Sequence, residues 1–130
     1  MIENNNLAYD NNYRSEHSLF LQDKFNIFNR GVDYYNPFNL SFEFKECNSK
    51  KPKNQWYKVY EKQLRESKYH IFCLNNKEFY VHKSRFLLSK YSFKTYGNRA
   101  NIRINTIRKN YLYKTDNLND LKKFVDNMRE

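Results

Sequence analysis

Cysteine and histidine are scarce in this chain, and their scarcity excludes several kinds of site. Cys47 and Cys73 are the only cysteines, they lack Cys-x-x-Cys spacing, and the three histidines do not cluster. Structural zinc sites need closely spaced Cys and His ligands, so none is expected. Two thiols in a reducing compartment are expected to remain free, and we interpret both as core residues.

Long apolar runs are missing as well. No segment approaches the ~20 consecutive apolar residues that a membrane-spanning helix requires. Residues 1–12 are polar and Asn-rich and lack the apolar stretch of a secretion signal, so they are interpreted as a flexible leader. The chain is therefore predicted to be intracellular, either cytoplasmic or associated with a nucleoid or nucleus, and to have no membrane partner.

Acidic residues are outnumbered, with 14 Asp and Glu against 24 Lys and Arg, which gives a formal net charge of +10. A strongly basic chain favours a polyanionic partner, and DNA is the first candidate. With 12 Tyr and 11 Phe, the sequence has enough bulky side chains to form a core. Its 130 residues suit one domain, predicted over residues 13–130.

The spacing of apolar and turn residues predicts a small mixed β-sheet flanked by helices, an α/β fold. The expected elements, in chain order, are helix 15–28, strands 32–35 and 40–47, helix 55–67, strands 69–74 and 78–81, a short helix around 86–88, a strand near 102–106 and helix 118–128. Ser15 and Asp116 are the expected caps of the first and last helices.

The helix at 55–67 is predicted from an apolar stripe. Trp56, Val59, Tyr60 and Leu64 recur at i, i+3, i+4 and i+8, which is typical of an amphipathic helix. Trp56 is therefore expected in the core. The basic loop before it, at 48–54, is expected to be exposed.

Two carboxylates and a lysine occupy a pattern that indicates chemistry. Asp33 lies in the first strand of the predicted hairpin, and Glu43 and Lys45 lie on one face of the second strand, because strand side chains alternate. Carboxylate oxygens suit Mg²⁺, which can polarise a phosphoryl group and activate water. A lysine on the same face could position that water or stabilise the charge that develops on the phosphoryl group. The alternative is that Glu43 and Lys45 form an ordinary solvated strand face.

The context of this triplet distinguishes it from two others. Acid-x-Lys also occurs at Glu66-Ser67-Lys68 and at Asp120-Leu121-Lys122. Both of those fall on or beside predicted helices, and no Asp-bearing strand precedes them. Only Glu43-Phe44-Lys45 has the strand alternation that a site on a sheet requires.

In this arrangement residues 14–82 resemble the PD-(D/E)xK nuclease superfamily, which includes restriction enzymes, Holliday-junction resolvases and some homing endonucleases. Val32 stands where the signature has Pro. The resemblance implies a restriction endonuclease-like core and a Mg²⁺-dependent endonuclease, with Mn²⁺ as a substitute. It assigns Asp33, Glu43 and Lys45 to catalysis and implies that Glu16 and the Phe44 carbonyl assist Asp33 and Glu43 at the metal. Gln63 matches an accessory polar residue of some branches.

Several exposed cations are candidate contacts to DNA phosphates. They are Lys50, Lys51, Lys53, Arg99, Arg103 and Arg108. A core of this length would cut both strands of a duplex by forming a two-fold homodimer. The alternatives are a non-catalytic nucleic-acid-binding protein and a protein whose basic face binds an acidic protein.

The three histidines, His17, His70 and His82, are expected to be structural. A nuclease of the ββα-metal type would need a histidine base with metal ligands nearby in a helix and hairpin frame, and the sequence shows no such frame.

Overall fold

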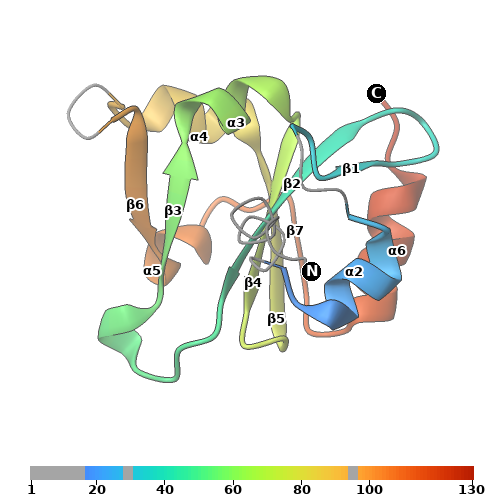
Figure 1. The fold of residues 1–130 in the computed structure, drawn as a ribbon, viewed down its shortest axis with the longest axis horizontal. Coiled ribbons are helices and arrows are strands. Elements are labelled where there is room, and N and C mark those ends of the chain that lie inside the picture. The colour runs from blue at the N-terminus through green and yellow to red at the C-terminus, as the bar shows by residue number, and fades with distance from the viewer. Residues whose placement is uncertain (1–16, 28–30, 94–96) are drawn as a thin grey trace, which may run out of the picture.

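The computed structural model describes residues 17–27, 31–93 and 97–130, which form a mixed α/β fold with two sheets (Figure 1). The main sheet has the strand order β1-β2-β4-β5-β7, and a second sheet pairs β3 with β6. The strands are β1 (Tyr34–Tyr35), β2 (Ser41–Cys47), β3 (Trp56–Tyr60), β4 (Tyr69–Leu74), β5 (Glu78–Lys83), β6 (Arg99–Arg103) and β7 (Tyr113–Thr115). The described helices are α2 (Leu19–Phe25), η1 (Pro52–Asn54, a 3-10 turn), α3 (Glu61–Glu66), α4 (Ser84–Lys90), α5 (Ile104–Ile107) and α6 (Leu118–Asn127). The predicted mixed sheet flanked by helices is confirmed.

The central pair, β2 and β4, is parallel, whereas the other neighbours in the main sheet are antiparallel. Parallel neighbours need a crossover connection, because a tight turn cannot join them. Here η1, β3 and α3 form that connection. The crossover therefore carries β3 onto one face of the main sheet, directly over β2.

A separate hydrophobic core lies on each face of the main sheet. The first, here called the α2/α6 core, contains Leu21, Phe25, Phe42, Phe44, Ile71, Cys73, Phe79, Val81, Leu121 and Val125. The second, here called the ribbon core, contains Tyr57, Val59, Leu64, Phe72, Leu74, Tyr80, Leu87, Ile102, Ile104 and Ile107. Figure 1 shows α2 and α6 on one side of the main sheet and the β3–β6 ribbon on the other.

Alternation along β2 places its two sets of side chains in different surroundings. Phe42 and Phe44 enter the α2/α6 core, so Glu43 and Lys45 face the side that the ribbon covers. The predicted faces of this strand are confirmed. The polar face is not freely solvated, however, because Glu43 is only 3% exposed.

The predicted helix at 55–67 is wrong in its first half. Residues 56–60 form β3, which pairs with β6, and only residues 61–66 are helical. Aromatic and β-branched side chains fit a pleated surface, and the partner strand lies too far along the chain for local periodicity to reveal it. Trp56 is accordingly half-buried, outside the ribbon core, and not the core residue that was predicted.

Other predicted elements differ in their ends. The first helix covers only Leu19–Phe25 and stops at Asn26, which adopts a left-handed conformation with φ of 51°. The expected cap Ser15 lies outside the described residues. Asn117, and not Asp116, caps α6, because its side chain accepts a hydrogen bond from the Asp120 backbone N–H. Residues 104–107 form α5 where the strand had been expected to continue.

Both predicted hairpins are confirmed, and so are the exposed loop at 48–54 and the short helix that became α4. Strand β7 was not predicted. None of the described helices has the length and apolar character needed to cross a membrane.

Asn36, in the turn between β1 and β2, ties this hairpin to the end of α6. Its side-chain oxygen accepts hydrogen bonds from the backbone N–H groups of Phe38 (3.0 Å) and Leu40 (2.9 Å). Its amide group donates to the carbonyls of Val125 (2.7 Å) and Met128 (3.0 Å). Because Asn36 is only 5% exposed, water does not readily replace these bonds.

Two buried histidines face each other across β4 and β5, where His70 pairs with His82. Burial, followed by the charges of Lys45 and His82, lowers the pKa of His70 well below its usual value. Burial also lowers the pKa of His82, although the hydrogen bond from its Nε2 to the Ile107 carbonyl (2.8 Å) raises it in part. Burial therefore favours the neutral form of both imidazoles.

Replacement of Asn36 tests the link between the hairpin and α6. Asn36→Ala should lower the free energy of unfolding by about 2–4 kcal/mol in urea titrations, because it leaves buried donors and acceptors unpaired. Asn36→Asp keeps the acceptor oxygens but places a carboxylate against two carbonyls, so it should also destabilise. Asn39→Gly, in the same turn, is the control and should change stability little, because Asn39 is exposed and has φ of 64°. Equal stability of Asn36→Ala and wild type would contradict the assignment.

The histidine pair predicts a contribution to stability that is lost in mild acid. Below the unfolded-state pKa of about 6.5 the unfolded chain binds protons that the buried histidines do not bind, so the contribution of this pair to the unfolding free energy falls as pH decreases. His70→Gln should reduce this slope by up to about 1.4 kcal/mol per pH unit between about pH 6 and pH 5. Urea midpoints measured across this pH range test it. An unchanged slope in the variant would show that His70 is protonated in the fold.

Candidate active site

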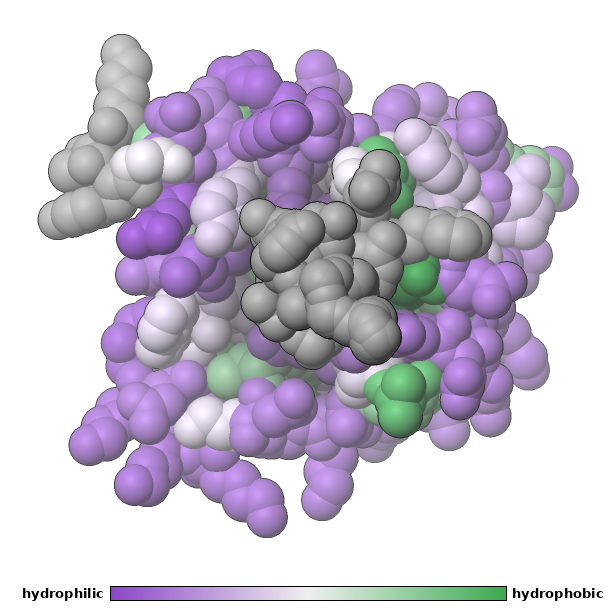
Figure 2. Space-filling view, in the orientation of Figure 1, coloured by the Kyte–Doolittle hydropathy of each residue, from purple (hydrophilic) through white to green (hydrophobic). Residues whose placement is uncertain are grey.

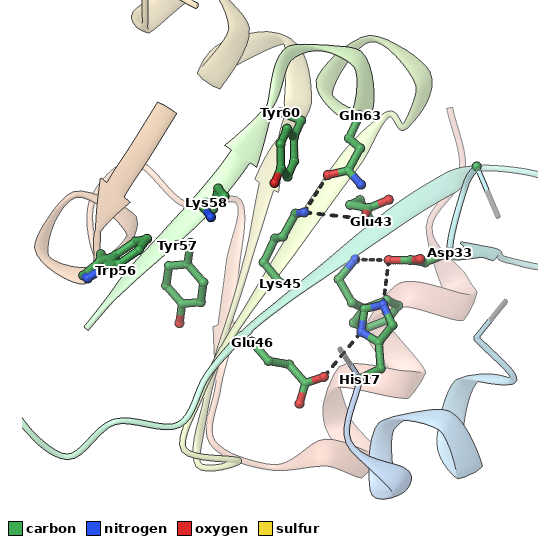
Figure 3. A pocket seen from close by; sticks show the side chains of 12 residues that line it. His17, Asp33, Glu43, Lys45, Glu46, Trp56, Tyr57, Lys58, Tyr60 and Gln63 are labelled. Atoms are coloured by element: carbon green, nitrogen blue, oxygen red, sulfur yellow. Dashed lines mark hydrogen bonds and ion pairs between the residues drawn. The ribbon is translucent and has the colours of Figure 1, made fainter. Parts of the chain in front are cut away.

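A pocket of about 460 Å³ opens between β2 and the β3–α3 segment (Figure 3). It brings together the predicted catalytic residues with side chains from the crossover and from the segment before α2. Its lining consists of His17, Gly31, Asp33, Glu43, Phe44, Lys45, Glu46, Trp56, Tyr57, Lys58, Tyr60 and Gln63.

Asp33 and Glu43 are neighbours because of the hairpin register. Tyr34 pairs with Phe42, so the preceding residue Asp33 falls opposite Glu43. Asp33 Oδ2 accepts a hydrogen bond of 2.9 Å from the backbone N–H of Phe44, which fixes this carboxylate against β2. The two carboxyl groups are 4% and 3% exposed as residues, so both sit at the bottom of the pocket.

The surroundings of Glu43 disfavour the ionised form of its carboxyl group. Burial, and then the negative charge of Asp33, raise the pKa of Glu43 far above its ordinary value, although Lys45 acts in the opposite direction. Its Oε1 atom is buried and has no hydrogen-bond partner among the described residues. A positive group that reached this oxygen would favour the ionised carboxylate.

Lys45 is the next residue after Glu43 on the polar face of β2, and it lines the same pocket. Its Nζ donates a hydrogen bond of 2.5 Å to Gln63 Oε1 and lies 3.7 Å from Glu43 Oε2. It also lies 5.2 Å from the centre of the Tyr60 ring. Gln63 comes from α3, so the crossover positions the amide that holds the lysine.

The cluster also contains His17, whose sequence context predicts only a structural role, and Glu46, which is not among the predicted site residues. His17 Nε2 lies 3.3 Å from Asp33 Oδ2, and its Nδ1 lies 3.4 Å from Glu46 Oε2. Glu46 Oε2 also accepts a hydrogen bond of 2.8 Å from the backbone N–H of Ser18. Burial lowers the pKa of His17, but the hydrogen bonds and charges of both carboxylates outweigh it and raise the pKa to about 9. The imidazole is thus a cation between two carboxylates.

One sequence signal could have identified Glu46. Leu40, Phe42 and Phe44 alternate on the apolar face of β2, and Glu46 is the next residue on that face. A carboxylate at an apolar position needs a partner, because its burial alone is costly. No comparable signal marks His17, whose contact with β2 depends on how the segment before α2 folds back.

The remaining predicted site residues are spread over the surface. Lys50, Lys51 and Lys53 are exposed in the loop between β2 and β3, and Arg99 and Arg103 are exposed on β6. Arg108, after α5, forms an ion pair with Glu78 at 3.0 Å. Glu16 lies outside the described residues. The role of each cation in DNA binding stays a prediction.

Asp33 and Glu43, at the bottom of the pocket, are the side chains that would hold a hard divalent cation. Within residues 17–27, 31–93 and 97–130, no group of three or more His, Cys, Asp and Glu side chains could hold a metal ion. Asp33 and Glu43 offer carboxylate oxygens, one of them unpaired, and Mg²⁺ is commonly bound by one or two carboxylates together with water and substrate oxygens. Comparison of the chain with protein-family models, curated proteins and solved structures finds no match. The functional assignment therefore rests on the chemistry of this site.

The coupling between Asp33, Glu43 and Lys45 can be measured directly. Asp33→Asn should lower the pKa of Glu43, because it removes a neighbouring negative charge and keeps an oxygen that can accept from the Phe44 N–H. Lys45→Met should raise the pKa of Glu43 further. Carboxyl-carbon NMR titration of ¹³C-labelled glutamate tests both, and Glu66→Gln, on the exposed end of α3, is the control. A Glu43 pKa that does not respond to either change would refute the proximity of these groups.

Proposed function

We propose that this chain is a Mg²⁺-dependent endonuclease that hydrolyses phosphodiester bonds in DNA, of the PD-(D/E)xK type. One observation carries the proposal. The pocket brings together Asp33, Glu43 and Lys45, and Gln63 accepts a hydrogen bond from the lysine. The net charge of +10 supports a polyanionic substrate. The PD-(D/E)xK type is taken from the resemblance in sequence over residues 14–82.

Each side chain has a distinct role in this reaction. Asp33 and Glu43 would hold the cation, which supplies Lewis-acid activation of the phosphoryl group and of water. Lys45 Nζ would orient the attacking water and stabilise the negative charge that grows on the phosphoryl oxygens. Gln63 would keep Lys45 directed at the pocket, because its Oε1 accepts the lysine hydrogen bond.

The buried charges explain why such a site would bind a cation. Burial, and then the negative charge of Asp33, favour the protonated form of Glu43. Binding of a divalent cation would offset that charge and release the proton. Metal affinity should therefore increase with pH.

A second function, non-catalytic binding of nucleic acid, is favoured by a different observation. His17 and Lys45 already supply two positive groups beside Asp33, Glu43 and Glu46. A network balanced in this way could serve only to hold α2 and the crossover on the sheet. In that case the exposed cations alone would account for nucleic-acid binding, and the pocket would have no catalytic role.

Cleavage assays with and without Mg²⁺ separate the two functions. Labelled single strands, duplexes, flaps and four-way junctions should include at least one substrate that is cut only when Mg²⁺ is present. Glu43→Gln and Asp33→Asn should abolish cleavage while DNA binding remains, because each removes an anionic ligand. Lys45→Ala should slow the reaction by about 10²–10³-fold, the range seen when one transition-state donor is lost.

The control uses another acid-x-Lys triplet. Glu66→Gln removes the acid of Glu66-Ser67-Lys68, whose side chain lies on the exposed end of α3, and should leave cleavage unchanged. Full activity of Glu43→Gln, or binding to every substrate without cleavage of any, would refute the nuclease assignment. The second result would favour the non-catalytic function.

A further inference from the structure

The β3–β6 ribbon has two faces of opposite character. Tyr57 and Val59 of β3 and Ile102 of β6 point into the ribbon core. The alternate residues, Trp56, Lys58, Tyr60, Arg99, Asn101 and Arg103, form the other face, which is here called the outer face. Every residue of the outer face is exposed or half-buried.

The register arranges the outer face in pairs. Directly opposite residues of antiparallel strands point to the same side, so Trp56 lies beside Arg103, Lys58 beside Asn101, and Tyr60 beside Arg99. Three cations and two aromatic rings thus share one surface, and neither strand contains an acidic residue. In Figure 2 the surface over β3 and β6 is mostly purple and pale, the colours of polar and intermediate side chains.

The outer face continues into the candidate active site. Trp56, Lys58 and Tyr60 line the same pocket as Glu43 and Lys45. Figure 3 shows Tyr60 beside Lys45 at one end of β3 and Trp56 at the other end. Four residues of strand place the two aromatic positions roughly 13 Å apart, with Lys58 between them.

We propose that the outer face binds an unpaired DNA strand and leads it to the pocket, with a base stacked on Trp56 and phosphates near Lys58, Arg99 and Arg103. Half-buried aromatic rings between cations suit an unpaired strand, because its bases are free to stack on the exposed part of a protein ring. Bases inside a duplex already stack on each other, so they would leave Trp56 unused. This inference rests on the proposed function and narrows its substrate to DNA with a single-stranded segment.

Trp56 is the only tryptophan in the chain, so its fluorescence reports directly on the outer face. Wild-type protein is titrated, in a chelator and without Mg²⁺, with oligothymidylate of about 12 nucleotides, within the range that single-strand-binding folds cover. We expect saturable quenching of Trp56. A blunt duplex of the same length should bind more weakly and quench less.

Anisotropy of the labelled oligothymidylate gives a readout that does not need the tryptophan. Trp56→Ala should weaken binding about tenfold, and Trp56→Phe should restore most of the affinity, because it keeps a ring for stacking. Lys58→Ala/Arg103→Ala should reduce the log–log salt slope by about 1.4, the value for two lost phosphate contacts on a single strand. Lys90→Ala/Lys123→Ala, which removes two exposed charges from α4 and α6, is the control and should keep the wild-type slope.

Quenching that is absent or equal for the duplex would overturn the inference, and so would wild-type affinity in Trp56→Ala. If that variant does not fold, the wild-type titration and Trp56→Phe still decide. Failure of the nuclease proposal looks different: quenching would occur, but no substrate would be cut with Mg²⁺. If DNA is cleaved but Trp56 fluorescence does not change and Trp56→Ala binds normally, the nuclease proposal is supported and the proposal that the outer face binds a single strand is refuted.

Discussion

The parallel pairing of β2 with β4 is the constraint on which the site depends. It requires a crossover, and this crossover carries β3 and α3 over the polar face of β2. Glu43 and Lys45 would otherwise form a solvated strand face. Under the crossover they become the bottom of a pocket, and burial shifts the pKa of Glu43. The same segment supplies Gln63, so one connection both buries the charged groups and holds them in place.

The sequence was informative where structure is local. Alternation along β2 and the turn at Asn36 predict the first hairpin, and the hairpin alone is enough to bring Asp33 opposite Glu43. The second hairpin follows from the same signals. The polar triad was therefore predictable as a set, although the depth of its burial was not.

Elements that depend on distant partners were not predictable in this way. Residues 56–60 satisfy a helical spacing, but pairing with β6 makes them a strand and turns Trp56 toward the pocket. His17 likewise reaches Asp33 only because residues 17 and 18, directly before α2, lie against Glu46 of β2. In both cases tertiary contacts outweigh local periodicity, which is a weak guide for short segments rich in aromatic residues.

The long sequence separation between β3 and β6 also bears on how the molecule folds. Closing a large loop costs more entropy than closing a hairpin, so we expect β4 and β5 to pair before β6 reaches β3. The ribbon would then be among the last parts to assemble. In an incompletely folded chain, β2 would expose Glu43 and Lys45 without the pocket that β3 completes. The protein would therefore acquire its function only at the final step of folding.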